Sequence, residues 1–140
     1  MKQFLILLLL SASITLVNCG DDKDGDADFL AQFVGTWQSS NITAAGCNDP
    51  EENGTLNCDP FCFEITITAN GTYSLLESGS QSPETGTITA TETTVTICET
   101  GETNCDSQDP YSFSGENTFS ITFTDEDSPG CQFTAVFNRQ

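Results

Sequence analysis

Short runs in which apolar and polar residues alternate constrain the fold of this chain more than any other feature. Thr, Ile, Val, Phe and Tyr recur in these runs, and Gly, Asn, Asp or Pro stand between one run and the next. Alternation with a period of two places one set of side chains on each face of a β-strand. Eight such runs lie at residues 36–43, 62–68, 72–77, 84–90, 93–98, 110–114, 118–124 and 131–138. The pattern predicts an antiparallel sheet with one buried face.

The connections between the runs indicate how this sheet is arranged. Asn70-Gly71 is the strongest turn signal, since both residues tolerate the positive φ of a tight hairpin. Asp28 to Gly35 has a capping residue, an apolar turn and a final glycine, which predicts one short helix. Eight strands joined by hairpins can bury one face and remove their edges by closing. We therefore expect an all-β domain at residues 29–140, a small eight-stranded antiparallel up-and-down barrel with a short N-terminal helix. A β-sandwich of two sheets is the alternative.

Residues 1–18 have the layout of a secretory signal peptide. A positive charge at Lys2 precedes an apolar run, which gives way to Ser, Ala and Thr. This run is shorter than the roughly 20 residues that a membrane-spanning helix needs. Leu16-Val17-Asn18-Cys19 resembles the lipobox of bacterial lipoproteins, although Asn18 stands where that family usually has Gly, Ala or Ser. The resemblance implies cleavage before Cys19 and attachment of acyl chains such as palmitate to that cysteine.

The segment that follows Cys19 is too charged and too rich in glycine to pack into a core. Residues 20–28 contain five aspartates and two glycines, so they predict a solvated spacer between the lipid and the domain. The run also resembles the acidic signal with which lipoproteins of bacteroidete type reach the outer face of the outer membrane. We therefore expect a lipid-anchored protein of the outer membrane that is exposed on the cell surface.

Seven cysteines in an exported chain leave one without a disulfide partner. Acylation of Cys19 would account for the odd one. The remaining six are Cys47, Cys58, Cys62, Cys98, Cys105 and Cys131. Many pairings of six cysteines are possible, and we predict only that of Cys98 with Cys105, which would close a short loop over a glycine-containing turn. The spacing of Cys58 and Cys62 also suits zinc, but an oxidising compartment favours disulfides.

Gly35-Thr36-Trp37 opens the first expected strand and resembles the Gly-x-Trp signature of lipocalins and the wider calycin group. In that family the Trp closes one end of the barrel, and an arginine at the end of the last strand crosses its face. The resemblance therefore places Arg139 over Trp37 as a cation-π pair. Residues 61–63 and 70–73 are also similar to the second and third strands of lipocalin-like domains in surface lipoproteins of bacteroidete type. The resemblance implies that the domain binds a small apolar ligand.

An up-and-down barrel sorts its connections between its two ends. The short connections would share one end with the helix and Trp37, and the long connections would share the other. All six remaining cysteines and 13 of the 21 acidic residues lie at or beside the long connections. We therefore expect a disulfide-linked, anionic rim that points away from the membrane. The many inward aromatics predict a filled interior with at most a shallow pocket at this rim.

Charge and composition limit the partners and the chemistry of the chain. From Cys19 onward it carries 21 acidic and two basic residues, a net charge of −19, which excludes nucleic acid and suits cations or basic proteins. There is no histidine, and Lys23 lies in the spacer, so we expect neither enzyme activity nor a cofactor. Asp125 and Asp127 are weak candidates for Ca²⁺ ligands, and we expect a solvated acidic surface without a metal.

Two functions remain open on these grounds. The first is a monomeric surface lipoprotein, held at the membrane by its lipid, that binds a small hydrophobic or cationic ligand without catalysis. The second is a protein-interaction or inhibitor module of the cell surface, or a Ca²⁺-binding module, that acts through the acidic rim loops.

Overall fold

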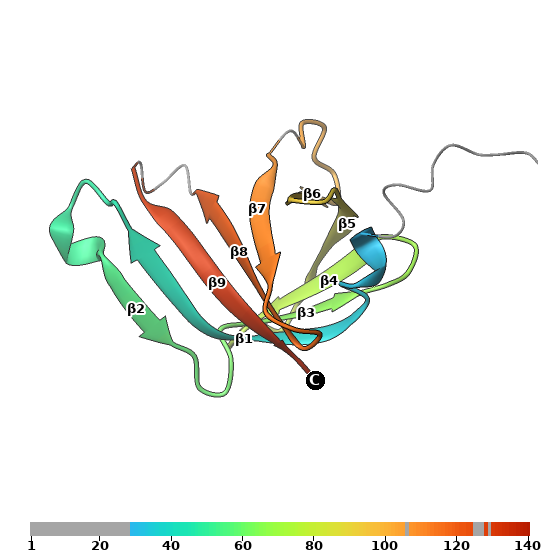
Figure 1. The fold of residues 1–140 in the computed structure, drawn as a ribbon, viewed down its shortest axis with the longest axis horizontal. Coiled ribbons are helices and arrows are strands. Elements are labelled where there is room, and N and C mark those ends of the chain that lie inside the picture. Colours follow the sequence, from blue (N-terminus) through green and yellow to red (C-terminus); the bar gives the residue numbers. More distant parts are fainter. Residues whose placement is uncertain (1–28, 106, 125–127, 129) are drawn as a thin grey trace, which may run out of the picture.

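The computed structural model describes residues 29–140, except residues 106, 125–127 and 129 (Figure 1). Nine strands form one antiparallel sheet in the order β2-β1-β3-β4-β5-β6-β7-β8-β9. They are β1 (Gly35–Ala45), β2 (Gly54–Asn57), β3 (Phe63–Ile67), β4 (Thr72–Glu77), β5 (Glu84–Ala90), β6 (Thr94–Glu99), β7 (Asp109–Phe113), β8 (Thr118–Thr124) and β9 (Gln132–Arg139). A 3-10 helix, η1 (Pro50–Glu52), precedes β2. The signal peptide, Cys19 and the spacer, which were expected at residues 1–28, lie outside the described residues.

The sheet closes into a barrel because β9 returns to pair with β1. The two strands lie side by side from Trp37, opposite Arg139, to Ala45, opposite Gln132. β1 and β3 to β9 thus form an eight-stranded antiparallel up-and-down barrel, and each predicted run is one of its strands. The predicted barrel is confirmed, and the alternative of a β-sandwich is wrong.

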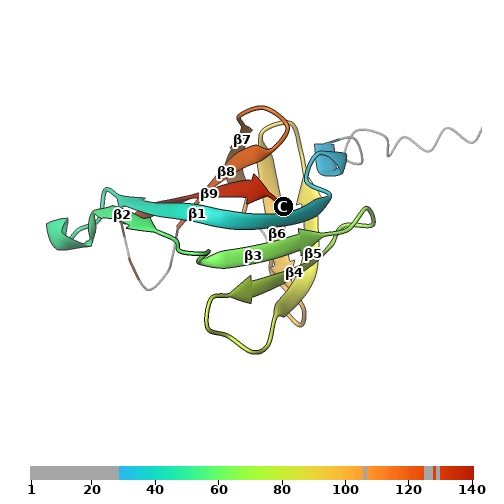
Figure 2. The ribbon, with the colours of Figure 1, turned by 90° about the horizontal axis from the view of Figure 1, so that it is seen from below.

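A ninth strand, β2, lies outside the barrel. The sequence predicts a loop between the first two barrel strands, whereas the structure has η1 and β2 there. β1 is long enough to pair twice along one edge, with β3 at Gly35–Gln38 and with β2 at Asn41–Ala44. Figures 1 and 2 show β2 and η1 beside the far half of β1, which reaches past the barrel. We call this part, residues 41–57, the extension.

Ser39 occupies the point at which β1 exchanges β3 for β2. Its side chain is buried, and its Oγ accepts hydrogen bonds from the backbone N–H groups of Cys62 at 3.1 Å and Phe63 at 2.7 Å. These bonds satisfy donors where the ladder between β1 and β3 ends. The pairing of β1 with β9 also shifts between Ser39 and Asn41. Because of this bulge, Trp37 and Ile42 both pack into the core, although strict alternation would put them on opposite faces.

Aromatic rings close the end of the barrel at which the described chain begins. Residues 29–31 form one helical turn, shorter than the predicted helix. Phe33 follows this turn and is 1 % exposed. Its ring contacts those of Tyr111, Phe113 and Phe119 edge to face, with centroids 4.8 to 5.3 Å apart. Edge-to-face packing suits aromatic rings because their positive edges meet negative faces.

Arg139 fixes the same end by contacts to both the ring of Trp37 and the backbone. Its guanidinium carbon lies 4.0 Å from the centroid of the Trp37 ring, the arrangement that the lipocalin resemblance implies. Nη1 donates to the carbonyl of Val34 at 2.7 Å, and Nη2 donates to that of Gln32 at 2.9 Å. The indole N–H of Trp37 donates to the carbonyl of Phe33 at 2.7 Å. The last strand thus holds the entry of the chain against the barrel.

Replacing Arg139 by lysine should lower the free energy of unfolding by about 1.5 to 3 kcal/mol, because an ammonium group cannot span both carbonyls and stack on the indole. Urea unfolding followed by Trp37 fluorescence measures the change. Gln140→Ala, at the neighbouring exposed side chain, is the control and should stay within about 0.5 kcal/mol of the wild type. An Arg139→Lys protein as stable as this control would contradict the role given to Arg139.

Candidate ligand-binding cavity

The interior of the barrel is hollow. A cavity of about 340 Å³ extends from Phe33 at the closed end to Phe123 and Thr124 at the open end. Its walls come from Phe33 and from six strands, β3 to β6, β8 and β9, with one residue of β7. The lining is Phe33, Phe63, Ile65, Ile67, Tyr73, Leu75, Ile88, Val95, Ile97, Asp109, Phe119, Ile121, Phe123, Thr124, Ala135 and Phe137. The expectation of a filled interior with only a shallow rim pocket is therefore wrong.

The cavity borders the packed aromatic rings of the closed end. Large rings gather at the closed end, where Trp37 contacts Phe119 with centroids 4.8 Å apart. Of the small inward residues Gly86, Ala90 and Ala135, Ala135 is the one that lines the cavity. An eight-stranded barrel is just wide enough to hold one small ligand when side chains do not fill it.

Gly86 is also required where it stands, beside Tyr73. A Cβ at this position would lie 2.0 Å from the carbonyl oxygen of Cys98 and 2.7 Å from Cε1 of Tyr73. The Tyr73 hydroxyl donates to Oε1 of Glu84 at 2.6 Å. Burial raises the pKa of Tyr73, as do this hydrogen bond and the charges of Glu84, Glu99 and Glu102. The phenol is therefore neutral and is already bonded to a carboxylate at the open end.

Among the described residues, Asp109 is the only one with a carboxyl group in the cavity wall. It begins β7 and lies opposite Val95 of β6. Among the described residues none donates a hydrogen bond to its carboxylate, and burial raises its pKa. In the sequence this residue is one of the acidic residues beside the long connections of the predicted rim. It directly precedes the predicted run 110–114, and its spacing of two residues from Tyr111 and four from Phe113 could have shown that it shares their inward face.

The seam between β6 and β7 is the least paired part of the barrel. Only Thr94 and Val95 of β6 face β7, opposite Pro110 and Asp109. The hydroxyl of Tyr111 reaches across at the closed end and donates to the carbonyl of Thr91 at 2.7 Å. Residues 96–99 of β6 pair with β5 alone. Asp109 therefore lies where the pairing between β6 and β7 in the cavity wall ends.

Apolar surface continues from the cavity onto the extension. A groove of about 520 Å³ is lined by Ile42, Leu56 and Phe133 among others, and it shares Phe63 and Phe123 with the cavity. Leu56 is 62 % exposed, the only large apolar side chain so exposed in the described part of the chain. The open end of the cavity therefore adjoins this groove on the extension.

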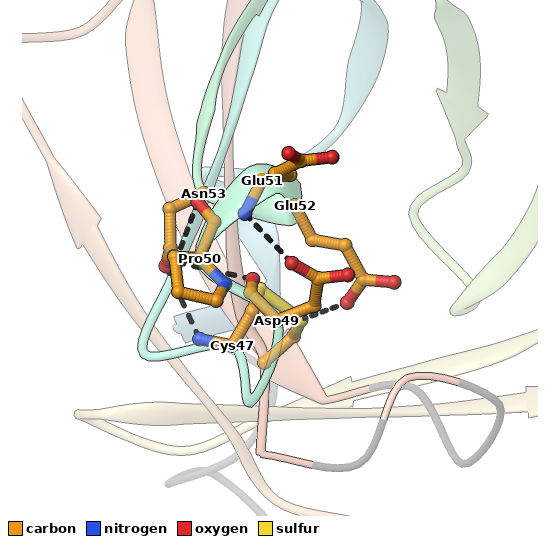
Figure 3. The surroundings of a disulfide bond; sticks show 7 residues. Cys47, Asp49, Pro50, Glu51, Glu52 and Asn53 are labelled. Carbon is orange, nitrogen blue, oxygen red and sulfur yellow. Dashed lines mark hydrogen bonds between the residues drawn. A yellow bond between two sulfur atoms is a disulfide. The ribbon is translucent and has the colours of Figure 1, made fainter.

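All six described cysteines form disulfides, Cys47 with Cys131, Cys58 with Cys62 and Cys98 with Cys105. The last is the predicted pair, and because Cys58 and Cys62 are bonded to each other they are not free to bind zinc. By the topology, all three disulfides lie on the connections of the open end. Cys47 with Cys131 ties the extension to the connection between β8 and β9 (Figure 3).

The acidic residues near this disulfide are engaged in local structure. Asp49 caps η1 by accepting a hydrogen bond from the N–H of Glu51 at 2.9 Å, and Asn53 accepts one from the N–H of Cys47 at 3.1 Å (Figure 3). A carboxylate oxygen of Glu52 lies 3.6 Å from the sulfur of Cys131. Sulfurs joined in a disulfide have no thiolate to offer a metal, so this group is not a metal site while the bond is intact. The proposed Ca²⁺ ligands Asp125 and Asp127 lie outside the described residues.

Gly35, Trp37 and Arg139, the residues of the resemblance, meet at the closed end. Gly35 has a φ of +137°, and a Cβ there would lie 2.7 Å from Nη1 of Arg139. Only glycine leaves room for the guanidinium to reach the carbonyl of Val34. These three residues therefore support the barrel and lie away from its mouth.

Gly86→Ala should lower the free energy of unfolding by about 1 to 3 kcal/mol or more, because the added methyl overlaps the backbone of β6. Gly54→Ala is the matched control, since a Cβ at Gly54 meets nothing within 4 Å. Both variants can be compared by urea unfolding. The close approach of β5, β6 and Tyr73 would be refuted by equal stability of the two variants.

Replacing Asp109 by asparagine should make stability less dependent on pH. Because folding raises the pKa of Asp109 above its ordinary value of 3.8, its ionisation costs the folded protein stability as pH rises through the raised pKa. The asparagine variant lacks this cost, so its advantage over the wild type should be absent at low pH and reach a plateau at neutral pH. Urea unfolding between about pH 3 and pH 8 measures it. The same comparison with Glu92→Gln, on the exposed turn before β6, should show no such growth.

Comparison with protein-family models, with curated proteins and with solved structures finds no match for this chain. In the part of the chain that the structure describes, no helix is long and apolar enough to cross a membrane. The inferences below therefore rest on the residues of this chain alone.

Proposed function

We propose that this protein is a lipid-anchored surface lipoprotein whose barrel binds a small, mainly apolar ligand without catalysis. The observation that carries the proposal is the cavity. Its volume of about 340 Å³ lies within the range of small-molecule sites, about 300 to 1,000 Å³. Its lining is apolar except for Tyr73, Asp109 and Thr124. A ligand would gain about 25 cal/mol for each Å² of apolar surface removed from water.

The proposed anchor at Cys19 is compatible with an accessible mouth. Phe29, the first described residue, packs against the core near the closed end, where the backbone of Gln32 and Val34 is bonded to Arg139. Residues 20–28 can span at most about 30 Å when fully extended. With the anchor on that side, the disulfide-linked open end would face away from the membrane, and a ligand would reach the cavity from solution.

We propose binding without catalysis because few side chains suited to catalysis are available. The sequence has no histidine, and Arg139 is the only Lys or Arg of residues 29–140. Its guanidinium is held at the closed end by the carbonyls of Gln32 and Val34. General-base and nucleophilic mechanisms need a base beside the reacting group, and Asp109 is the only carboxyl that the described residues place in the cavity wall. Binding therefore suits this interior better than turnover.

A second function is favoured by the extension. β2 ends the order of the sheet, so one of its edges has no neighbouring strand among the described residues. Its Leu56 is exposed and adjoins the apolar groove. An unpaired edge can accept a strand from another protein. A protein-interaction role through the extension is therefore the alternative to ligand binding in the cavity.

Ile97→Trp should weaken binding of a neutral fluorescent probe, N-phenyl-1-naphthylamine, about tenfold or more, because the larger side chain occupies the cavity. The full chain with Cys19→Ala serves as the reference, so that no lipid competes for the probe. Thr96→Trp adds the same ring on the outer face of β6 and is the matched control. Fluorescence titration that shows no saturable binding to the reference protein, or equal binding to both tryptophan variants, would reject a cavity site and favour the extension.

A further inference from the structure

We propose that the ligand of the cavity is an amphiphilic cation, an alkylamine or arylalkylamine whose apolar body fills the cavity and whose ammonium group contacts Asp109. This inference rests on the proposed function, since it names the ligand class for the same cavity. It is carried by one juxtaposition, a carboxylate without a described donor in the wall of a cavity whose other lining residues are apolar except for Tyr73 and Thr124.

Asp109 is held in this wall by the fold. Its backbone pairs with Val95, and the next inward residue of β7, Tyr111, is fixed by its bond to Thr91. The Asp109 carboxylate therefore remains on the cavity side, where burial removes part of its hydration. A buried charge is costly unless a partner of opposite charge or hydrogen-bond donors replace the lost water. An ammonium group supplies both.

The surroundings disfavour the opposite ligand, an anion such as a fatty acid. Glu77, Glu84 and Glu99 occupy the same face of β4, β5 and β6 as the cavity residues, at the open ends of these strands. The hydroxyl of Tyr73 is already donated to Glu84. Arg139 is engaged with carbonyls at the closed end. A ligand carboxylate in the cavity would therefore meet negative charge and no free cation from residues 29–140.

The open seam lets the cationic group retain water. β6 continues past Val95 to Glu99 without pairing to β7, and Asp109 is itself only partly buried. An ammonium group at this position would lie between the apolar chamber and the solvent, so that its charge need not be fully desolvated. The apolar body would point toward Phe33 and the closed end.

Three ligands of equal chain length test the inference, octylamine, 1-octanol and octanoate, each used to displace N-phenyl-1-naphthylamine from the full chain with Cys19→Ala. Octylamine should bind about tenfold more tightly than 1-octanol, and octanoate should bind most weakly. Asp109→Asn should remove the preference for octylamine, so that octylamine and 1-octanol bind this variant with similar Kd values. Asp109→Glu should keep the preference, as should Glu92→Gln on the outer turn.

High salt separates the cavity from the acidic surface. At about 1 M NaCl the Debye length is about 3 Å, so attraction by the distant carboxylates is screened. A preference for octylamine that survives this salt and is weakened by Ile97→Trp supports a contact inside the cavity. A preference that salt abolishes, or that Ile97→Trp leaves intact, places the amine on the surface and overturns the inference.

The wild type gives an independent test if Asp109→Asn does not fold. Octylamine stays protonated below pH 8, so its advantage over 1-octanol should fall as pH is lowered through the raised pKa of Asp109. The titratable groups on neighbouring elements are Glu99 on β6 and Glu102 in the described part of the next connection; β8 has none. Glu99→Gln and Glu102→Gln should leave the pH at the midpoint of this fall close to that of the wild type. A preference that does not vary with pH contradicts a contact with Asp109.

The outcomes distinguish this inference from the function on which it rests. Binding of 1-octanol and the neutral probe without a preference for octylamine overturns the inference that the ligand is an amine, but it agrees with a ligand site in the cavity. A preference that persists in Asp109→Asn overturns the amine in the same way. Failure of all three ligands and of the probe to bind overturns both.

Discussion

The pairing of β1 with β9 is the constraint on which the rest of the structure depends. It removes both edges of an eight-stranded sheet at once and brings Arg139 to Trp37. Once these strands meet, the apolar faces of all eight turn toward one interior, and the guanidinium reaches the backbone that enters the barrel. The extension depends on the same strand, because β1 continues beyond its pairing with β3 and pairs there with β2. The closure of the barrel, the packing at its closed end and the extension therefore all depend on the position of β1.

The cavity and its charge follow from how that interior is filled. Aromatic residues pack together where Phe33, Trp37 and Phe119 meet, and the cavity continues from them toward Phe123 and Thr124. A hollow interior tolerates a carboxylate better than a packed one does, because Asp109 keeps some contact with solvent at the seam between β6 and β7. The incomplete pairing of β6 with β7 thus weakens the barrel locally and leaves the cavity wall open beside Asp109.

The sequence predicts the strands far better than the site. The bounds of β4, β5 and β8 match the predicted runs because alternation is regular there and turn residues stand at both ends. β2 was missed because Leu56 is its only apolar residue, so it has no alternation to detect. The bulge near Ser39 changes the parity of β1, which no periodic rule anticipates. The volume of the cavity depends on both the closure of the barrel and the register of its strands. The pairing of Cys47 with Cys131 depends on their distance in the folded protein, which their spacing in the sequence does not give.

The disulfide between Cys47 and Cys131 also determines how the molecule responds to mechanical force. It encloses β2 to β8 in one covalent loop and leaves only β1 and β9 outside. Tension that enters at residue 29 can unravel the chain as far as Cys47 and no farther while the bond is intact, because beyond it the force passes through the sulfurs to Cys131. A tether pulling on the N-terminal side would therefore extend residues 29–46 before it could open the remainder, and most strands of the chamber would lie beyond the reach of the pull.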